Sequence, residues 1–193
     1  MELNYIIKKS RRRSISIHVS DDKNIVVKVP LSTPEFVAKN FINEKKDWIL
    51  KQIAKLEVQK QQALYMGLLT VEEIRQLKKK ARILIPERVD YYSKISGIPY
   101  NRIFIRLQKS RWGSCSVEGN LNFNCLLVLM PHEVLDSVVV HELCHRRHMN
   151  HSREFYDELL KIYPDYKKWN KWLKENGGAY FKRIYHMVTG SPR

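Results

Sequence analysis

Apolar and polar residues alternate over Ser14–Ser20 near the start of the chain, and a second short strand-like stretch, Asn24–Pro30, follows it. Alternation with a period of two is typical of a strand that buries one face. The polar residues Asp21, Asp22 and Lys23 separate the two stretches at a length that suits a turn. The sequence therefore predicts an N-terminal β-hairpin.

A helical period replaces this alternation after Leu31. Ser32 or Thr33 is the expected N-cap, and Pro34 the first helical residue, because the first turn of a helix needs no amide from proline. The helix is expected to continue to about Gln62. Its apolar face consists of Phe36, Phe41, Trp48, Ile49 and Ile53.

Gly67 separates this helix from a second one. Thr70 and Glu73 have the spacing of a capping box, which predicts a helix start, and Gly97 predicts the end of that helix. Pro86 lies inside it, so a kink or a restart is expected there.

Strand patterns return in the segment that follows. Asn101–Gln108 is predicted as a strand, and residues 111–130 as a hairpin that turns near Glu118 and Gly119. The two faces of its returning strand hold Leu121, Phe123 and Cys125 on one side and Asn120, Asn122 and Asn124 on the other.

Helical patterns fill the remainder of the chain. Pro131 opens a helix with the apolar stripe Leu135, Val138, Val139 and Leu143. Another helix is expected from Ser152, and a last one over Tyr166–Glu175, ended by Gly177 and Gly178.

The order of these elements predicts an α+β fold with a small antiparallel sheet, because strands and helices come in runs instead of alternating. We expect a strand pair and helix over residues 1–66, packed on or appended to the core, and a main domain over residues 67–193. The N-terminus lacks the apolar stretch of a signal peptide and no apolar run is long enough to cross a bilayer, so a soluble cytoplasmic protein without a membrane partner is expected.

Charge and cysteine content add two expectations. The formal net charge is +15, spread along the chain apart from the run Arg11–Arg13, which leaves a nucleic-acid partner open beside the simpler interpretation of a solvated surface. Basic residues interleaved with Trp169 and Trp172 fit an amphipathic helix better than a base-stacking surface. The three cysteines form no CxxC pair and are expected to be reduced thiols.

The helix after Pro131 contains the pattern HExxH. His141 and His145 lie four residues apart, so both imidazoles leave the same helix face, where one zinc ion can bind both. Glu142 is rotated away by about 100° and lies beside the metal, where its carboxylate can activate zinc-bound water. These residues therefore predict a catalytic zinc site.

A catalytic zinc usually has three protein ligands. His151 is the expected third ligand, because the segment after His145 breaks the helix and lets the chain return to the metal. The alternatives are His148 and one of the acids that follow, which are Glu154, Asp157 and Glu158.

The segment Lys109–Ser116, on the hairpin before this helix, is expected to line a substrate cleft. An extended peptide can add to a sheet edge through main-chain hydrogen bonds, with Gly113 allowing close approach and Trp112 forming a wall. A core position for Trp112 and a bulge at Gly113 are the structural alternatives. Tyr156 and Arg153 are candidates for the donor that stabilises an oxyanion.

The motif SRWGSCS, followed by VVVHELCHRRHMNHSREFY, resembles the YgjP-like zinc metallopeptidases, which are related to the SprT-like proteases. The early segment RRRSISIHVSDDKNIVVKVPLSTPEFV is also similar to that family. The resemblance implies a minimal zincin domain with His141, His145 and His151 as ligands and Glu142 as the base. It also matches the hairpin motif at residues 111–115, which include Ser114.

The resulting hypothesis is a zinc-dependent metallopeptidase that acts on peptides or proteins. The alternatives are a nucleic-acid-associated binding module stabilised by zinc, with Cys115 or His148 as a fourth ligand, and a SprT-like protease that acts on DNA-bound proteins. Glu142 discriminates between them, because a structural zinc needs no base.

Overall fold

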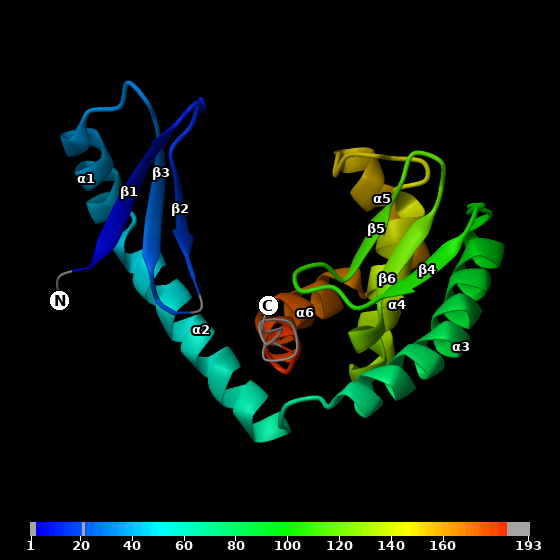
Figure 1. Cartoon of the computed structure of the whole chain (residues 1–193). Coiled ribbons are helices and arrows are strands. Elements are labelled where there is room, and N and C mark those ends of the chain that lie inside the picture. Colours follow the sequence, from blue (N-terminus) through cyan, green and yellow to red (C-terminus); the bar gives the residue numbers. More distant parts are fainter. Residues whose placement is uncertain (1–2, 21, 185–193) are drawn as a thin grey trace. The chain divides into compact units, whose positions relative to one another are not determined.

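The computed structural model describes residues 3–20 and 22–184, which have an α+β architecture. They form two compact units, Met1–Gln62 and Ala63–Arg193, each with a three-stranded sheet and a buried core (Figure 1). No helix within the described residues combines the length and apolar character needed to span a bilayer. The domain predicted over residues 67–193 ends in residues 185–193, which lie outside the described part of the chain.

The sheet of the first unit has the strand order β1-β3-β2, with β1 at Tyr5–Ser10, β2 at Ser16–Val19 and β3 at Ile25–Pro30. Strands β2 and β3 are antiparallel and form the predicted hairpin. Strand β1 is not among the predicted strands and pairs in parallel with the other edge of β3. Apolar side chains of β3 pack against the two helices that follow it.

Two helices, α1 (Glu35–Glu44) and α2 (Lys46–Met66), replace the single predicted helix. Lys45 between them has φ −93° and ψ 9°, and the apolar period contains no glycine or proline that would indicate this break. The predicted N-cap is also wrong. Pro34 is extended (φ −63°, ψ 150°) and occupies the N-cap, because the amide of Thr33 closes a turn onto the carbonyl of Pro30 instead.

The second unit begins with α3 (Val71–Ser96), whose predicted capping box is confirmed. The amide of Glu73 donates to Thr70 Oγ1 at 3.2 Å, and the amide of Thr70 donates to Glu73 Oε2 at 2.7 Å. The helix continues through Pro86 without a restart and ends at Gly97, whose φ of 65° is in the left-handed region that favours glycine.

The second sheet has the order β4-β6-β5, with β4 at Ile103–Arg106, β5 at Gly113–Cys115 and β6 at Leu121–Asn124. The predicted hairpin of β5 and β6 is confirmed. The sheet is mixed, not wholly antiparallel as predicted, because β4 pairs in parallel with β6. That pairing skips the intervening strand, so neighbouring strands in sequence do not predict it.

Helix α4 (His132–Cys144) lies in the middle of this unit, in contact with α3, α5 (Arg153–Ile162), α6 (Tyr166–Lys182) and strand β5 (Figure 1). A short 3-10 helix, Cys125–Leu129, leads into it. Arg88 of α3 donates two hydrogen bonds of 2.7 Å to the buried carboxylate of Asp136, which connects α3 to α4. The burial of α4 fixes the orientation of the face that carries the HExxH residues.

Helix α6 continues through Gly177 and Gly178, so the helix end predicted there is wrong. A Cβ atom on Gly177 would lie 3.0 Å from Cζ2 of Trp112, which shows that this glycine permits close packing. The longer helix brings Phe181 onto Trp112, with ring centroids 4.0 Å apart. The indole is therefore held partly in the core, as the structural alternative for Trp112 expected.

Candidate metal centre

Three imidazoles converge at the end of α4 and in the segment that follows it. Nε2 of His141 lies 3.2 Å from Nε2 of His145 and 3.1 Å from Nε2 of His151. His141 and His145 are brought together by one helical turn, and His151 by the short segment before Ser152, whose side chain caps α5. These three are the predicted set of histidines.

The other ring nitrogens face away from this point of convergence. Nδ1 of His145 lies 2.9 Å from the backbone carbonyl of His148, and Nδ1 of His141 lies 2.9 Å from the hydroxyl of Tyr166. A carbonyl only accepts, so His145 carries its proton on Nδ1, and in the neutral ring Nε2 is left as a lone pair. Hydrogen bonds thus hold both rings with Nε2 toward one point.

Burial favours the uncharged form of His141 and His145. Burial, together with the neighbouring His145 and His151, lowers the pKa of His141 to about 3. Burial also lowers the pKa of His145. Neutral imidazole is the form that binds a metal ion, because only this form has a free lone pair.

The separations of His141 from its two neighbours suit a zinc ion. The ligating atoms lie within 4.8 Å of one another. Zinc–nitrogen bonds of 2.0–2.1 Å in a tetrahedral site place two nitrogens about 3.3 Å apart, close to the separations of His141 from its two neighbours. The group offers three histidine nitrogens among the described residues, and a catalytic zinc site usually has three protein ligands.

The carboxylate of Glu142 lies on the adjacent side of α4, next to Gly113 of β5. It is 5% exposed, and burial raises its pKa to about 8. A Cβ atom on Gly113 would lie 2.6 Å from both Cγ and Oε1 of Glu142. The close approach predicted at Gly113 is therefore taken by this carboxylate, and glycine makes room for it.

A cavity of about 210 Å³ opens beside this carboxylate. Its wall includes His141 and Glu142 from α4 and Trp112 and Gly113 from the strand segment. The apolar residues Val138 and Leu173 and the polar residues Tyr166 and Asn170 complete most of the lining. A substrate side chain in this cavity would lie next to both a histidine of the cluster and the carboxylate.

The family model of the YgjP-like metallopeptidase domain matches residues 13–74 and 70–176 of the chain. The chain belongs to the YgjP-like family. No curated protein matches the YgjP-like chain.

Two solved structures are similar to this YgjP-like chain. One is the metallopeptidase zymogen of Pyrococcus abyssi abylysin, with 19% identity, a TM-score of 0.43, and coverage of 47% of this chain and 93% of that one. The other is the metallopeptidase zymogen of Methanocaldococcus jannaschii jannalysin, with 23% identity, a TM-score of 0.42, and coverage of 46% and 92%.

The alternative ligands of the YgjP-like chain have other partners. Nε2 of His148 lies 3.0 Å from Oε2 of Glu158, and Arg147 binds the same carboxylate. Asp157 pairs with Arg153 at 3.6 Å. The thiol of Cys115 donates to the carbonyl of Ser116. The three cysteines are free, as predicted.

Three other predicted site residues, Tyr156, Ser114 and Arg153, lie outside the histidine cluster. Tyr156 is 38% exposed and its ring centroid lies 6.2 Å from that of His151. Ser114 is half-buried on β5 opposite Asn122 of β6. The guanidinium of Arg153 is exposed and lies beside Asp157, so it is not held toward the histidines.

Tyr166 is the residue that sequence analysis missed. It is 5% exposed, starts α6, and contacts His141 from 25 positions further along the chain. Its segment shows only a helix start, and no local pattern links that start to α4.

Proposed function

We propose that this chain is a zinc-dependent metallopeptidase in which His141, His145 and His151 hold the metal and Glu142 is the general base. The convergence of three Nε2 atoms beside a buried carboxylate is the observation that carries the proposal. When bound, zinc supplies Lewis acidity, which polarises a carbonyl and lowers the pKa of water at the open position to about 7.

Glu142 is suited to take a proton from that water. Burial raises the pKa of Glu142 and so makes its carboxylate a stronger base than one in solvent. A bound zinc ion would lower that pKa and so favour the ionised form. Gly113 supports this role because it leaves space for the carboxylate on the β5 side. The water oxygen would bond to the carbonyl carbon of the peptide, the C–N bond would break, and Glu142 would pass the proton to the departing amine.

The substrate is expected to lie along β5, with one side chain in the cavity beside Trp112. Main-chain hydrogen bonds to a strand edge bind a peptide without reading its side chains. Ser114 lies on this strand, and the ring of Tyr156 stacks on that of His151. We assign both to substrate contact, and Tyr156 to the second donor for the oxyanion.

The test is the variant Glu142→Gln. It keeps the size of the side chain and the three histidines, so zinc binding should be retained while turnover falls by about 100-fold or more. Cleavage of a mixed peptide library, measured by mass spectrometry, gives the turnover, and metal analysis gives the zinc content.

Glu133→Gln is the matched control, because Glu133 lies exposed in the first turn of the same helix. This variant should cleave like wild type. Equal rates for wild type and Glu142→Gln, at full zinc occupancy, would refute the assignment of the base.

A further inference from the structure

The sheet of the N-terminal unit has one packed face and one open face. Ile25, Val27 and Val29 of β3 are buried against α1 and α2. The alternate residues of β3 point to the other side, where Lys28 is exposed. No large aromatic side chain lies among the residues of the three strands on that side.

Two lysines lie directly side by side on the open face. Lys8 of β1 and Lys28 of β3 are partners in the register of the parallel pair, and both are exposed. Ser16 of β2 is the next residue in the same row. Like charges opposite one another on neighbouring strands lower the stability of a sheet. Repulsion between the two lysines therefore lowers the stability of the free sheet, and a bound anion would offset that repulsion.

Three arginines extend this positive surface. Arg11, Arg12 and Arg13 follow β1 directly, at the end of the sheet nearest the lysine row. Arg12 is half-buried, and its Nε is shielded from solvent without a hydrogen-bond partner among the described residues. Guanidinium groups present several N–H donors whose geometry matches phosphate oxygens.

Among the described residues of this unit, no acidic side chain lies on the open face of the sheet. The described acids are Asp22 in the turn between β2 and β3, Glu35 and Glu44 on α1, and Asp47 and Glu57 on α2. The turn with Asp22 lies at the opposite end of β3 from the arginines, roughly 17 Å away for six residues of strand. Three of the acids already pair with lysines outside the open face.

We propose that Lys8, Lys28 and Arg11–Arg13 form a basic face that binds the phosphate backbone of nucleic acid. Closely spaced cations without an acid between them match a polymer whose charge repeats at short intervals. A protein partner would require an apolar interface core, and a membrane surface would require exposed aromatic or leucine side chains. Ile6 is the one exposed large apolar side chain among the described residues of this face, which is mainly polar and charged instead.

The proposal is tested on the full-length chain with the double variant Lys8→Thr/Lys28→Thr. Threonine suits a strand, and removal of the like-charge pair should leave the melting temperature unchanged or raise it. Binding to a fluorescein-labelled 20-base-pair DNA duplex, measured by anisotropy at several salt concentrations, should weaken by roughly tenfold or more. The slope of log K against log salt should become shallower by about 1.8.

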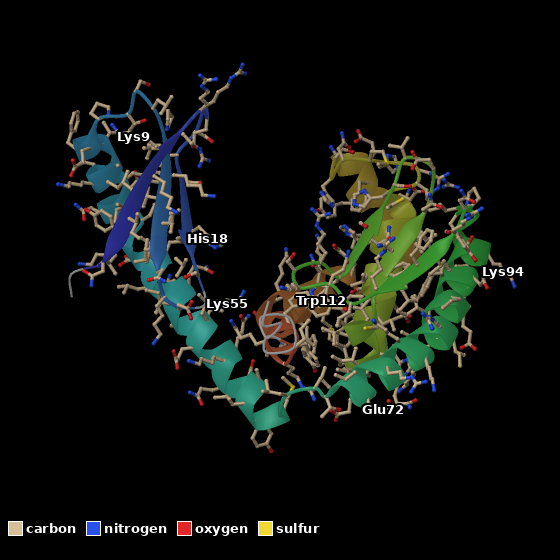
Figure 2. All side chains as sticks on the ribbon, in the orientation of Figure 1. Lys9, His18, Lys55, Glu72, Lys94 and Trp112 are labelled. Carbon is tan, nitrogen blue, oxygen red and sulfur yellow. The ribbon has the colours of Figure 1, made fainter. Side chains whose placement is uncertain are left out.

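Lys51→Ala/Lys55→Ala is the matched control. Both lysines are exposed on α2, where Figure 2 labels Lys55, and their loss changes the net charge by the same amount. The proposal expects this control to bind like wild type. Equal weakening in both double variants, or no binding by wild type, overturns it. Binding to phosphatidylserine vesicles in place of DNA also overturns it, because the partner would then be a membrane.

Discussion

Each of two histidines in the cluster is held by a hydrogen bond on the side away from the metal position. His145 is held by a carbonyl of the turn that follows α4, and His141 by the hydroxyl at the start of α6. Partners of this kind fix the tautomer and the ring orientation of a metal-binding histidine. Metal affinity should therefore depend on Tyr166, although this residue does not belong to the cluster itself.

Tyr166→Phe should weaken zinc binding by about 10- to 100-fold, because Nδ1 of His141 loses its partner inside the protein. Competition with a chromophoric chelator measures the affinity without any activity assay. The melting temperature of the metal-free variant should remain close to that of wild type.

Tyr163→Phe is the control for this prediction. Its hydroxyl donates to the carbonyl of Glu133 at 3.0 Å and does not contact the histidines. If both tyrosine variants bound zinc as tightly as wild type, the hydrogen bond of Tyr166 would have no role in holding the metal.

Sequence predicts the residues of this site only where they share one helix or one short segment. His141, Glu142 and His145 follow from helical spacing, and His151 from its distance behind them along the chain. Tyr166 does not, because its contact with His141 depends on how α6 packs against α4. The close approach of Gly113 to Glu142 also joins two separate elements, so no local pattern predicts it.

At the level of elements, the buried side-chain amide of Asn124 holds the segment that carries Trp112. Asn124 ends β6, is fully buried, and donates to the carbonyls of Gln108 and Arg111 at 2.8 and 3.0 Å. Its Oδ1 accepts from the amide of Leu126 at 3.1 Å. The side chain therefore connects the segment before β5 to the start of the 3-10 helix.

Asn124→Ala should lower the free energy of unfolding by about 3 kcal/mol, from three buried hydrogen bonds at about 1 kcal/mol each. Asn122→Ala, on the same strand, should cost less than about 1 kcal/mol, because Asn122 accepts one exposed hydrogen bond from Arg106. Urea denaturation of both variants measures the difference. Similar values for the two would mean that Asn124 does not hold the segment.

Elements with local signals were predicted well, and elements that depend on tertiary contacts were not. The capping box at Thr70 and the hairpin turn at Gly119, whose φ is 85°, have short-range causes. Strand β1 and the parallel pairing of β4 with β6 depend on segments distant in sequence. The glycine pair in α6 favours a helix end locally, but packing against Trp112 outweighs it.

For the whole molecule, the histidine cluster belongs to only one of the two cores. The core of the first unit is built from β3, α1 and the start of α2, whereas the histidines and their partners lie within Ala63–Arg193. A ligand stabilises only the structure that binds it. Zinc should therefore stabilise the second unit alone.

Zinc at about 1,000 times its dissociation constant should stabilise the second unit by roughly 4 kcal/mol relative to chelator-treated protein. Trp48 is in the first unit and the other three tryptophans are in the second. Tryptophan fluorescence of Trp48→Phe thus monitors the second unit, and its thermal transition should shift upward with zinc. Calorimetry should show a second transition that does not shift, and a single joint transition would contradict this expectation.

The contact between Gly113 and Glu142 has a consequence for genetics. Every missense change of a glycine codon introduces a Cβ atom, and at this position that atom would displace the carboxylate of Glu142. A position with no reactive group would then tolerate as little variation as the histidines. In a mutational scan based on activity, codon 113 would tolerate as few substitutions as codons 141, 142, 145 and 151. In a scan based on protein abundance, codon 113 would tolerate more substitutions than the codons of the buried core.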